Sequence, residues 1–167
     1  MQAHYIIIGA GSAGCVLAAR LSEDPSVSVI LLEAGGADTS PFIHIPAGFV
    51  KIMVNPSVNW MFSTASEDYL GGRSLKMPRG KVLGGTSSIN GMLYVRGLAS
   101  DYDSWAQCGN PGWSYDDVLP YFRKSEDFQL TVTKGNESYH NTGGPMHIDQ
   151  PRTRYLALDA IIDAAEE

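Results

Sequence analysis

The sequence predicts an α/β domain built on a parallel sheet with flanking helices, and three observations lead to this fold class. Residues 5–8 and 27–32 are short apolar runs rich in β-branched side chains, as in buried parallel strands. Residues 12–22 lie between them and carry an apolar stripe at helical spacing. A strand, a helix and a strand within about thirty residues predict a right-handed βαβ unit.

The rest of the chain predicts an excursion followed by helices. Residues 37–80 contain scattered prolines and aromatics, and Gly71-Gly72 predicts a hairpin within this stretch. Residues 80–97 predict a glycine-rich loop that runs into a short helix, with hydroxyl side chains at its start. Asp101 is expected to cap one later helix, and Ser114 with Asp117 resembles a capping box for the next. The remaining predictions are helices at 101–108 and 115–128, a loop at 131–144, a strand at 146–149 and a helix at 155–167.

Charge, hydropathy and cysteine content argue against several classes of protein. The chain has 167 residues with 12 basic and 18 acidic side chains, a formal net charge of −6. This balance argues against nucleic acid as a partner, because nucleic acid is bound by basic faces. No apolar stretch approaches the roughly 20 residues that a membrane span needs, and the first residues do not resemble a signal peptide. With only 2 cysteines, and none at a metal or redox spacing, a cytoplasmic protein is expected.

The first chemical signal is the stretch from Gly9 to Gly14, which has the G-x-G-x-x-G pattern between a predicted strand and a predicted helix. Gly9 permits a tight turn, and Gly11 has no side chain to keep a pyrophosphate from the backbone. Gly14 allows the helix to pack closely on the strand. The start of the helix offers free N–H groups and the positive end of its dipole to an anion.

Glu33 completes this signal. It lies at the end of the second predicted strand, where a carboxylate can accept hydrogen bonds from ribose hydroxyls. The same carboxylate would repel a 2′-phosphate, which disfavours NADP. Together these residues predict a Rossmann-like site for a dinucleotide, with the choice between NAD and FAD left open.

The second chemical signal is the stretch of residues 78–91. Gly84 and Gly85 allow the backbone to approach a ligand. Thr86, Ser87 and Ser88 add hydroxyl groups, and the helix start that they would cap could meet a phosphate or a polar ring edge. An ordinary loop before a capped helix explains the spacing equally well, so both interpretations stay open at this point.

Taken with the first motif, this segment resembles the glucose–methanol–choline oxidoreductases, most closely their choline-dehydrogenase-like branch. The stretch from Gly80 to Asp103 is similar to a long signature of that family. The motifs that add to the resemblance are Leu32-Glu33-Ala34-Gly35, Asn59-Trp60, Asp101-Tyr102-Asp103-Ser104-Trp105, Gly112-Trp113-Ser114-Tyr115 and Leu119-Pro120-Tyr121-Phe122. The resemblance covers essentially the whole chain.

The resemblance implies an FAD-dependent oxidoreductase that acts on CH–OH groups of alcohols, with hydride transfer to flavin N5. It places the backbone around Gly11 at the pyrophosphate, Glu33 at the adenosine ribose and Trp60 near the flavin. It places residues 79–87 at the inner phosphates and ribityl chain, and residues 90–93 beside the isoalloxazine ring. The implied cofactor-binding residues are Gly9, Gly11, Ser12, Ala13, Gly14, Glu33, Ala34, Trp60, Arg79, Gly80, Val82, Gly84, Gly85, Ser87, Asn90, Gly91, Met92 and Leu93.

The chain departs from the family pattern at two points, which bear on the attachment of FAD and on the catalytic base. Some members tether FAD covalently through a histidine, at the position where this chain has Ile89, so non-covalent FAD is expected. The family's catalytic base is a histidine near the C-terminus of the enzyme, and none of the four histidines here has a matching context. We therefore expect no catalytic residue in this chain, and no side-chain cluster has metal-ligand spacing.

The domain organisation expected from the resemblance is an incomplete one. Residues 1–144 would form the N-terminal part of the FAD-binding domain, and residues 145–167 would begin a truncated substrate-binding domain. The partners are then an alcohol and the C-terminal remainder of the same enzyme, and the specific alcohol is left open. Alternatives are a hydroxynitrile-lyase-type enzyme with structural FAD, a nucleotide-binding fragment without activity of its own, and an NAD-linked dehydrogenase.

Overall fold

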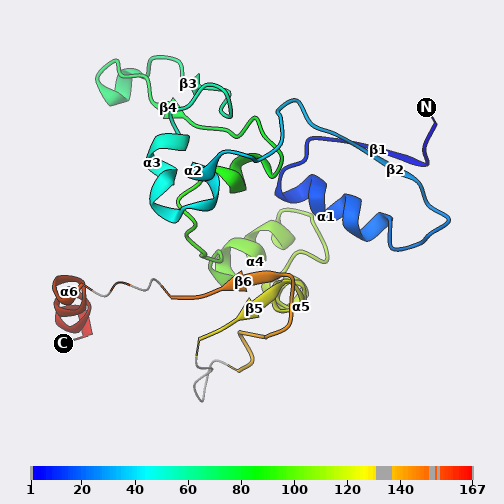
Figure 1. Ribbon diagram of the computed structural model, residues 1–167. Helices are drawn as coiled ribbons and strands as arrows, with labels where there is room; N and C mark the ends of the chain where they lie inside the picture. The colour runs from blue at the N-terminus through cyan, green and yellow to red at the C-terminus, as the bar shows by residue number, and fades with distance from the viewer. Residues whose placement is uncertain (1, 131–136, 151–152, 154, 167) are drawn as a thin grey trace. The chain divides into compact units, whose positions relative to one another are not determined.

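The computed structural model of the chain describes residues 2–130, 137–150, 153 and 155–166. The chain forms two compact units, Met1–Leu93 and Tyr94–Glu167 (Figure 1). This division reflects packing, whereas the predicted boundary at residue 144 separates two functional domains and stays a prediction. Among the described helices, none has the length and apolar character that crossing a bilayer requires.

The first unit begins with the predicted βαβ unit. Strand β1 (Tyr5–Ile8) and strand β2 (Val29–Leu32) are parallel neighbours, in register from Tyr5 opposite Val29 to Ile8 opposite Leu32. Helix α1 (Ser12–Leu21) connects them and lies along the pair (Figure 1). The order strand, helix, strand is therefore confirmed, and it brings the ends of both strands to the same edge.

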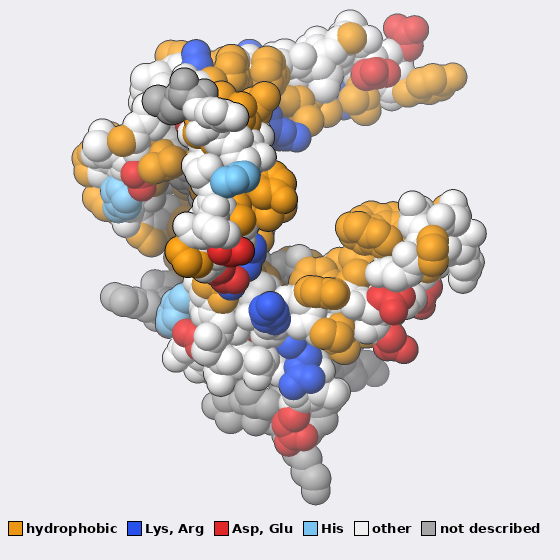
Figure 2. Space-filling model, turned by 90° about the vertical axis from the view of Figure 1, so that its right-hand side faces the viewer, with side chains coloured by type: hydrophobic (Ala, Val, Ile, Leu, Met, Phe, Trp, Pro, Cys, Tyr) orange, Lys and Arg blue, Asp and Glu red, His pale blue; other side chains and the backbone are white. Residues whose placement is uncertain are grey.

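The expectation that these two strands are buried is wrong. Ile8 is 87% exposed and Ile6 is 62% exposed, because within the described residues β1 and β2 form a two-stranded sheet. On the face seen in Figure 2, hydrophobic side chains are exposed at several places. Apolar runs of this kind are typical of parallel strands that are covered on both faces.

The excursion contains more regular structure than the sequence predicts. It forms helix α2 (Pro41–His44), the 3-10 turn η1 (Pro46–Gly48) and helix α3 (Phe49–Ile52). The predicted hairpin is confirmed: β3 (Phe62–Ser63) pairs antiparallel with β4 (Lys76–Met77). Its connection contains the 3-10 turn η2 (Asp68–Leu70), followed by Gly71 and Gly72 with φ of 65° and 74°.

The apolar core of this unit lies between the excursion and the second glycine-rich loop. Ile52 from α3 packs with Val82 and Ile89 from the loop, and these three side chains are essentially inaccessible. Ile43 and Val58 pack against them. This cluster fixes the loop to the excursion, so the backbone around residues 80–89 has a rigid support.

The predicted short helix within residues 80–97 is wrong. The structure has only the 3-10 turn η3 (Gly85–Ser88), preceded by Gly84 with φ of 89°. The hydroxyl side chains do not cap a helix that follows, because they are part of this turn themselves. Ser87 Oγ donates to the Gly84 carbonyl at 2.7 Å, and Ser88 Oγ donates to the Leu83 carbonyl at 2.8 Å.

The second unit contains α4 (Ala99–Gln107), α5 (Tyr115–Ser125), β5 (Glu126–Phe128), β6 (Met146–Ile148) and α6 (Leu156–Glu166). Strands β5 and β6 are parallel. Of the loop predicted at 131–144, residues 131–136 lie outside the described residues, and residues 137–144 contain turns and bends.

The helix ends in this unit bear on two capping predictions and on the predicted end of one helix. The capping box is confirmed, because the Asp117 N–H donates to Ser114 Oγ at 3.4 Å and the Ser114 N–H donates to Asp117 Oδ2 at 3.1 Å. Asp101 does cap its helix, because its side chain accepts from the Leu98 N–H at 2.8 Å, but it does so from within the first turn of α4, which begins at Ala99 and not at residue 101. Helix α5 ends at Ser125 and not at residue 128, because Glu126 starts a strand.

A buried ion pair explains why the chain leaves the helix at Glu126. Its carboxylate lies 2.7 Å from the Arg96 guanidinium, and both side chains are almost fully inaccessible. His140 Nδ1 lies 3.2 Å away, and the Asn141 N–H donates to the carboxylate at 2.7 Å. Burial alone would raise the pKa of Glu126, but the Asn141 N–H, Arg96 and His140 outweigh it and lower this pKa below its ordinary value.

Candidate functional site

Two glycine-rich loops meet at the edge where β1 and β2 end. Gly9 turns the chain directly after β1 with φ of 96°, a conformation that glycine adopts without strain. The Gly84 N–H donates to the Ala10 carbonyl at 2.8 Å. A Cβ on Gly85 would lie 2.8 Å from the Gly11 Cα, so the two backbones approach more closely than side chains would permit.

The glycines of the first loop have separable roles. A Cβ on Gly14 would lie 1.8 Å from the Gly9 carbonyl oxygen, so the absence of a side chain is what allows α1 to pack on the turn. A Cβ on Gly11 would meet nothing closer than the Gly85 Cα at 3.9 Å. Packing therefore demands Gly14, whereas Gly11 leaves open space next to the first turn of α1.

The first turn of α1 can accept an anion. Gly11 is its N-cap and supplies no side-chain cap. The N–H groups at the start of a helix have no partner within the helix, and the helix dipole makes this end positive. An anion next to Gly11 would therefore meet both free N–H donors and a favourable field.

Glu33 directly follows β2 and links the loop to the strand ends. Its Oε2 accepts from the Ala10 N–H at 2.8 Å, and its Oε1 accepts from the Gly35 N–H at 2.9 Å. A carboxylate offers about four acceptor positions, so two backbone bonds leave capacity for hydroxyl groups of a ligand. The side chain is half-buried, which gives it a fixed orientation.

These features surround a cleft of about 600 Å³ in the first unit. Its wall includes the ends of both parallel strands, both glycine loops and part of the excursion. Of the sequence-predicted residues, the cleft brings together Gly9, Gly11, Glu33, Ala34, Trp60, Arg79, Gly80 and Gly85.

An aromatic wall from the excursion borders the cleft. Trp60 and Phe62 stack in parallel, with ring centroids 5.9 Å apart. The preceding residue, Asn59, is buried, and its side-chain oxygen accepts from the backbone N–H groups of Met61 and Arg79 at 2.9 and 3.0 Å. Asn59 thus ties the aromatic wall to the start of the second glycine loop.

The remaining predicted residues do not line this cleft. Two of them, Gly14 and Val82, are buried. Others lie along the chain after the second loop, where Asn90 Oδ1 accepts from the Met92 N–H at 3.0 Å and Leu93 is 90% exposed. The predicted residues outside the cleft lining are Ser12, Ala13, Gly14, Val82, Gly84, Ser87, Asn90, Gly91, Met92 and Leu93.

Four lining residues were absent from the predicted set. Ile8 and Leu32 are the last residues of the two strands, and ligands of α/β sheets bind at such carboxyl ends, so the strand prediction contained this signal. Thr86 lies in the second glycine loop, and its hydroxyl accepts from the Gly80 N–H at 3.1 Å. Phe62 had no comparable signal, since its position depends on the hairpin register.

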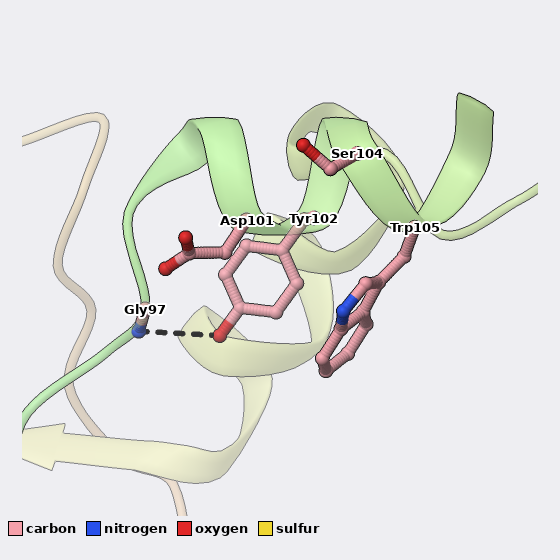
Figure 3. Close-up of a pocket in the computed structure, with 5 residues that line it drawn as sticks. All are labelled: Gly97, Asp101, Tyr102, Ser104 and Trp105. Carbon is pink, nitrogen blue, oxygen red and sulfur yellow. Dashed lines mark hydrogen bonds between the residues drawn. The ribbon is translucent and has the colours of Figure 1, made fainter. Parts of the chain in front are cut away.

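A second hollow, of about 400 Å³, lies in the second unit at the start of α4. Figure 3 shows the Tyr102 hydroxyl directed at the Gly97 nitrogen, and it accepts from that N–H at 3.3 Å. Asp101 and Ser104 likewise bond to nearby backbone groups. Trp105 is half-exposed and packs edge-to-face on Tyr102 and Trp113. The polar side chains of this hollow are already hydrogen-bonded to backbone groups of the second unit. We therefore assign no reactive group to it.

Neither a metal centre nor an isolated catalytic histidine is found among the described residues. No group of three potential ligands lies together there. Each histidine has a partner: His4 bonds to Ser28, His44 lies beside Asp38, His140 beside Glu126 and His147 beside Asp127.

Comparison with known proteins decides the family. The family described as GMC oxidoreductase matches residues 3–167 of the chain. The chain belongs to the GMC oxidoreductase family. Among curated relatives of this GMC oxidoreductase chain, the oxygen-dependent choline dehydrogenases of Brucella anthropi and Sinorhizobium fredii are each 47% identical over all 167 residues. The chain spans 30% of the length of these relatives.

Solved structures of similar fold agree with the GMC assignment. Pyridoxine 4-oxidase from Mesorbium loti superposes with a TM-score of 0.88 at 37% identity, over 99% of this chain and 32% of that one. An FAD-dependent oxidoreductase from Chaetomium thermophilum gives a TM-score of 0.82 at 32% identity, over 99% of this chain and 29% of that one. The predicted Rossmann-like α/β class is therefore confirmed, and the chain corresponds to one part of these longer proteins.

Proposed function

We propose that these 167 residues are the FAD-binding N-terminal part of a longer enzyme, called here the complete enzyme, that oxidises CH–OH groups of alcohols. The observation that carries the proposal is the cleft formed by two touching glycine loops and Glu33. FAD fits these residues, because open space at Gly11 faces an uncapped helix start. A pyrophosphate needs such a place, and a ribose needs an acceptor such as Glu33.

Each part of the cleft has a proposed role in holding FAD. Gly11, Ser12 and Ala13 receive the pyrophosphate with their backbone, and Gly9 and Gly14 shape the turn beneath it. Glu33 and Ala34 hold the adenosine ribose, and Trp60 borders the flavin side. Residues 79–87 hold the inner phosphates and ribityl chain, through Arg79, Gly80, Val82, Gly84, Gly85 and Ser87. Residues 90–93 would border the ring, and their backbone N–H groups would offer donors to negative charge on it.

The FAD is held without a covalent bond to this segment. Supporting this, Ile89 is only 1% exposed and packs with Ile52 and Val82. An aliphatic side chain cannot form a bond to the flavin, and this one contributes to the core beneath the loop. Affinity must therefore come from the backbone donors, Glu33 and the cleft walls.

The residues described here bind and orient the cofactor but do not perform proton transfer. FAD supplies the hydride acceptor when it is bound. General-base catalysis requires a group within hydrogen-bond reach of the substrate hydroxyl, and the four histidines of this chain are already paired elsewhere. The base therefore belongs to the C-terminal part of the complete enzyme.

The C-terminal part also covers surface that this chain leaves open. Tyr5 and Ile6 of β1 do not line the cleft and are 48% and 62% exposed, although such apolar strands are typically covered. Residues 1–144 belong to the FAD-binding domain, and residues 145–167 begin the substrate-binding domain. Choline is the first alcohol to examine, because the relatives at 47% identity are choline dehydrogenases.

Anaerobic mixing of the complete enzyme with choline and with other alcohols tests the function. The proposal predicts that at least one alcohol bleaches the visible absorption of the bound flavin. A hydroxynitrile-lyase-type enzyme would instead cleave cyanohydrins while its flavin stays oxidised. An enzyme whose redox change follows added NAD, with no bound flavin, would refute the cofactor assignment.

A further inference from the structure

Lys81 lies in the second glycine loop, and both its N–H and its carbonyl group are held in place by neighbouring backbone. Its N–H donates to the Val58 carbonyl at 2.7 Å. A Cβ on Gly35 would lie 2.0 Å from the Lys81 carbonyl oxygen, so this carbonyl is packed directly against another backbone. The next residue, Val82, is completely buried. The Lys81 side chain therefore starts from a well-defined position.

The ammonium group of Lys81 lies over the indole of Trp60. The distance from Nζ to the ring centroid is 4.7 Å, within the range in which a cation is attracted to the face of an aromatic ring. Trp60 is 44% exposed and lines the cleft. The ammonium thus contacts a ring that forms part of the proposed cofactor site, although Lys81 itself does not line the cleft.

The ring contact of this ammonium group is not accompanied by an ion pair in the described part of the chain. Glu33, which lines the cleft, accepts from backbone N–H groups. The Trp60 backbone is held by its N–H bond to the Arg79 carbonyl at 2.9 Å. The orientation of its side chain then depends on Phe62, with which it stacks, and on Lys81.

We propose that Lys81 is a positioning residue, which holds the Trp60 indole as a wall of the dinucleotide cleft through a cation–π contact. This inference rests on the proposed function, because it assigns Lys81 an effect on FAD binding through Trp60. It predicts that the charge of Lys81 contributes to FAD affinity only as long as the indole is present.

The affinity test compares the complete enzyme with three single variants. Lys81→Met removes the charge and keeps the length of the side chain, whereas Lys81→Arg keeps a cation that also binds aromatic faces. Lys76→Met is the matched control, because Lys76 is an exposed lysine in β4, a few residues before Lys81. Titration of the apoenzyme with FAD should give about two- to fivefold weaker binding for Lys81→Met. Lys81→Arg and Lys76→Met should bind FAD as the wild type does.

A double-mutant cycle with Trp60→Leu separates positioning from a direct effect of the charge on FAD. If Lys81 acts through the indole, Lys81→Met changes FAD affinity no further in the Trp60→Leu background. An equal loss in both backgrounds, or wild-type affinity of Lys81→Met itself, would overturn the inference.

An FAD-independent readout distinguishes failure of this inference from failure of the proposed function. The indole N–H resonance of Trp60, assigned with a Trp60→Phe variant, should move in Lys81→Met and stay in place in Lys76→Met. If wild-type enzyme binds no FAD, the proposed function fails, and this resonance still decides whether Lys81 holds the ring. An unmoved resonance contradicts the inference whatever FAD does.

Discussion

Gly14→Ala separates the packing role of this glycine from its helix propensity. Within α1, alanine is favoured over glycine by up to about 1 kcal/mol, so propensity alone predicts a more stable protein. The structure predicts the opposite. The new Cβ would lie 1.8 Å from the Gly9 carbonyl oxygen and 3.3 Å from Ile7 Cγ2, and the first of these contacts is with backbone that cannot rotate away.

The size of the effect follows from these distances. An ordinary contact is at least 3.4 Å, so α1 and the turn must separate by more than an ångström, at a cost near the upper end of the about 1–3 kcal/mol typical of overpacking. After the propensity gain is subtracted, the free energy of unfolding should fall by about 2 kcal/mol. The displaced helix start should also weaken FAD binding by roughly tenfold.

Thermal unfolding and FAD titration of the complete enzyme measure both effects. Gly36→Ala is the matched control, because a Cβ at Gly36 would meet nothing within 4 Å. This control should stay within about 0.5 kcal/mol of the wild type. If Gly14→Ala were as stable as Gly36→Ala and bound FAD equally well, the reasoning that Gly14 sets the distance between helix and turn would be refuted.

Three further substitutions test other parts of the structure. Glu33→Ala removes a charged acceptor from the cleft and should weaken FAD binding by about 10- to 100-fold in equilibrium titration; an unchanged affinity would remove Glu33 from the site. Ile52→Ala should lower the free energy of unfolding in urea by about 2–5 kcal/mol; a neutral effect would contradict the core assignment. Because the folded-state pKa of Glu126 lies below its ordinary value of 4.5, its contribution to stability is present above that pH and is lost as pH falls through the folded-state pKa. Glu126→Gln should therefore be less stable than the wild type at neutral pH, and thermal unfolding should show the difference shrinking in acid; a difference independent of pH would contradict this.

The sequence was most informative where structure is determined by neighbouring residues. The βαβ unit followed from periodicity and glycine spacing, because strand, turn and helix are consecutive there. The Ser114–Asp117 capping box could likewise be predicted, since its hydrogen bonds join residues only three positions apart. The position of Glu33 at the strand end followed from the same local pattern.

The failures concern residues whose structure depends on distant partners. Nothing local shows that Glu126 leaves α5 to meet Arg96, which lies in another segment of the chain. The turn η3 replaces the predicted helix because the Gly84 N–H bonds to Ala10, far away in sequence. Phe62 reaches the cleft only through the pairing of β3 with β4. Burial of β1 and β2 was expected from their apolar composition. The composition of a strand does not determine which other residues cover it.

The visible absorption spectrum of the purified complete enzyme, before and after acid precipitation, tests the central claim most directly. We expect flavin bands in the native protein that move quantitatively to the supernatant, where the released compound is FAD. Flavin that remains with the precipitate would contradict non-covalent binding and the interpretation of Ile89. A complete enzyme without flavin bands, which also fails to acquire them when incubated with FAD, would contradict the assignment of the cleft as an FAD site.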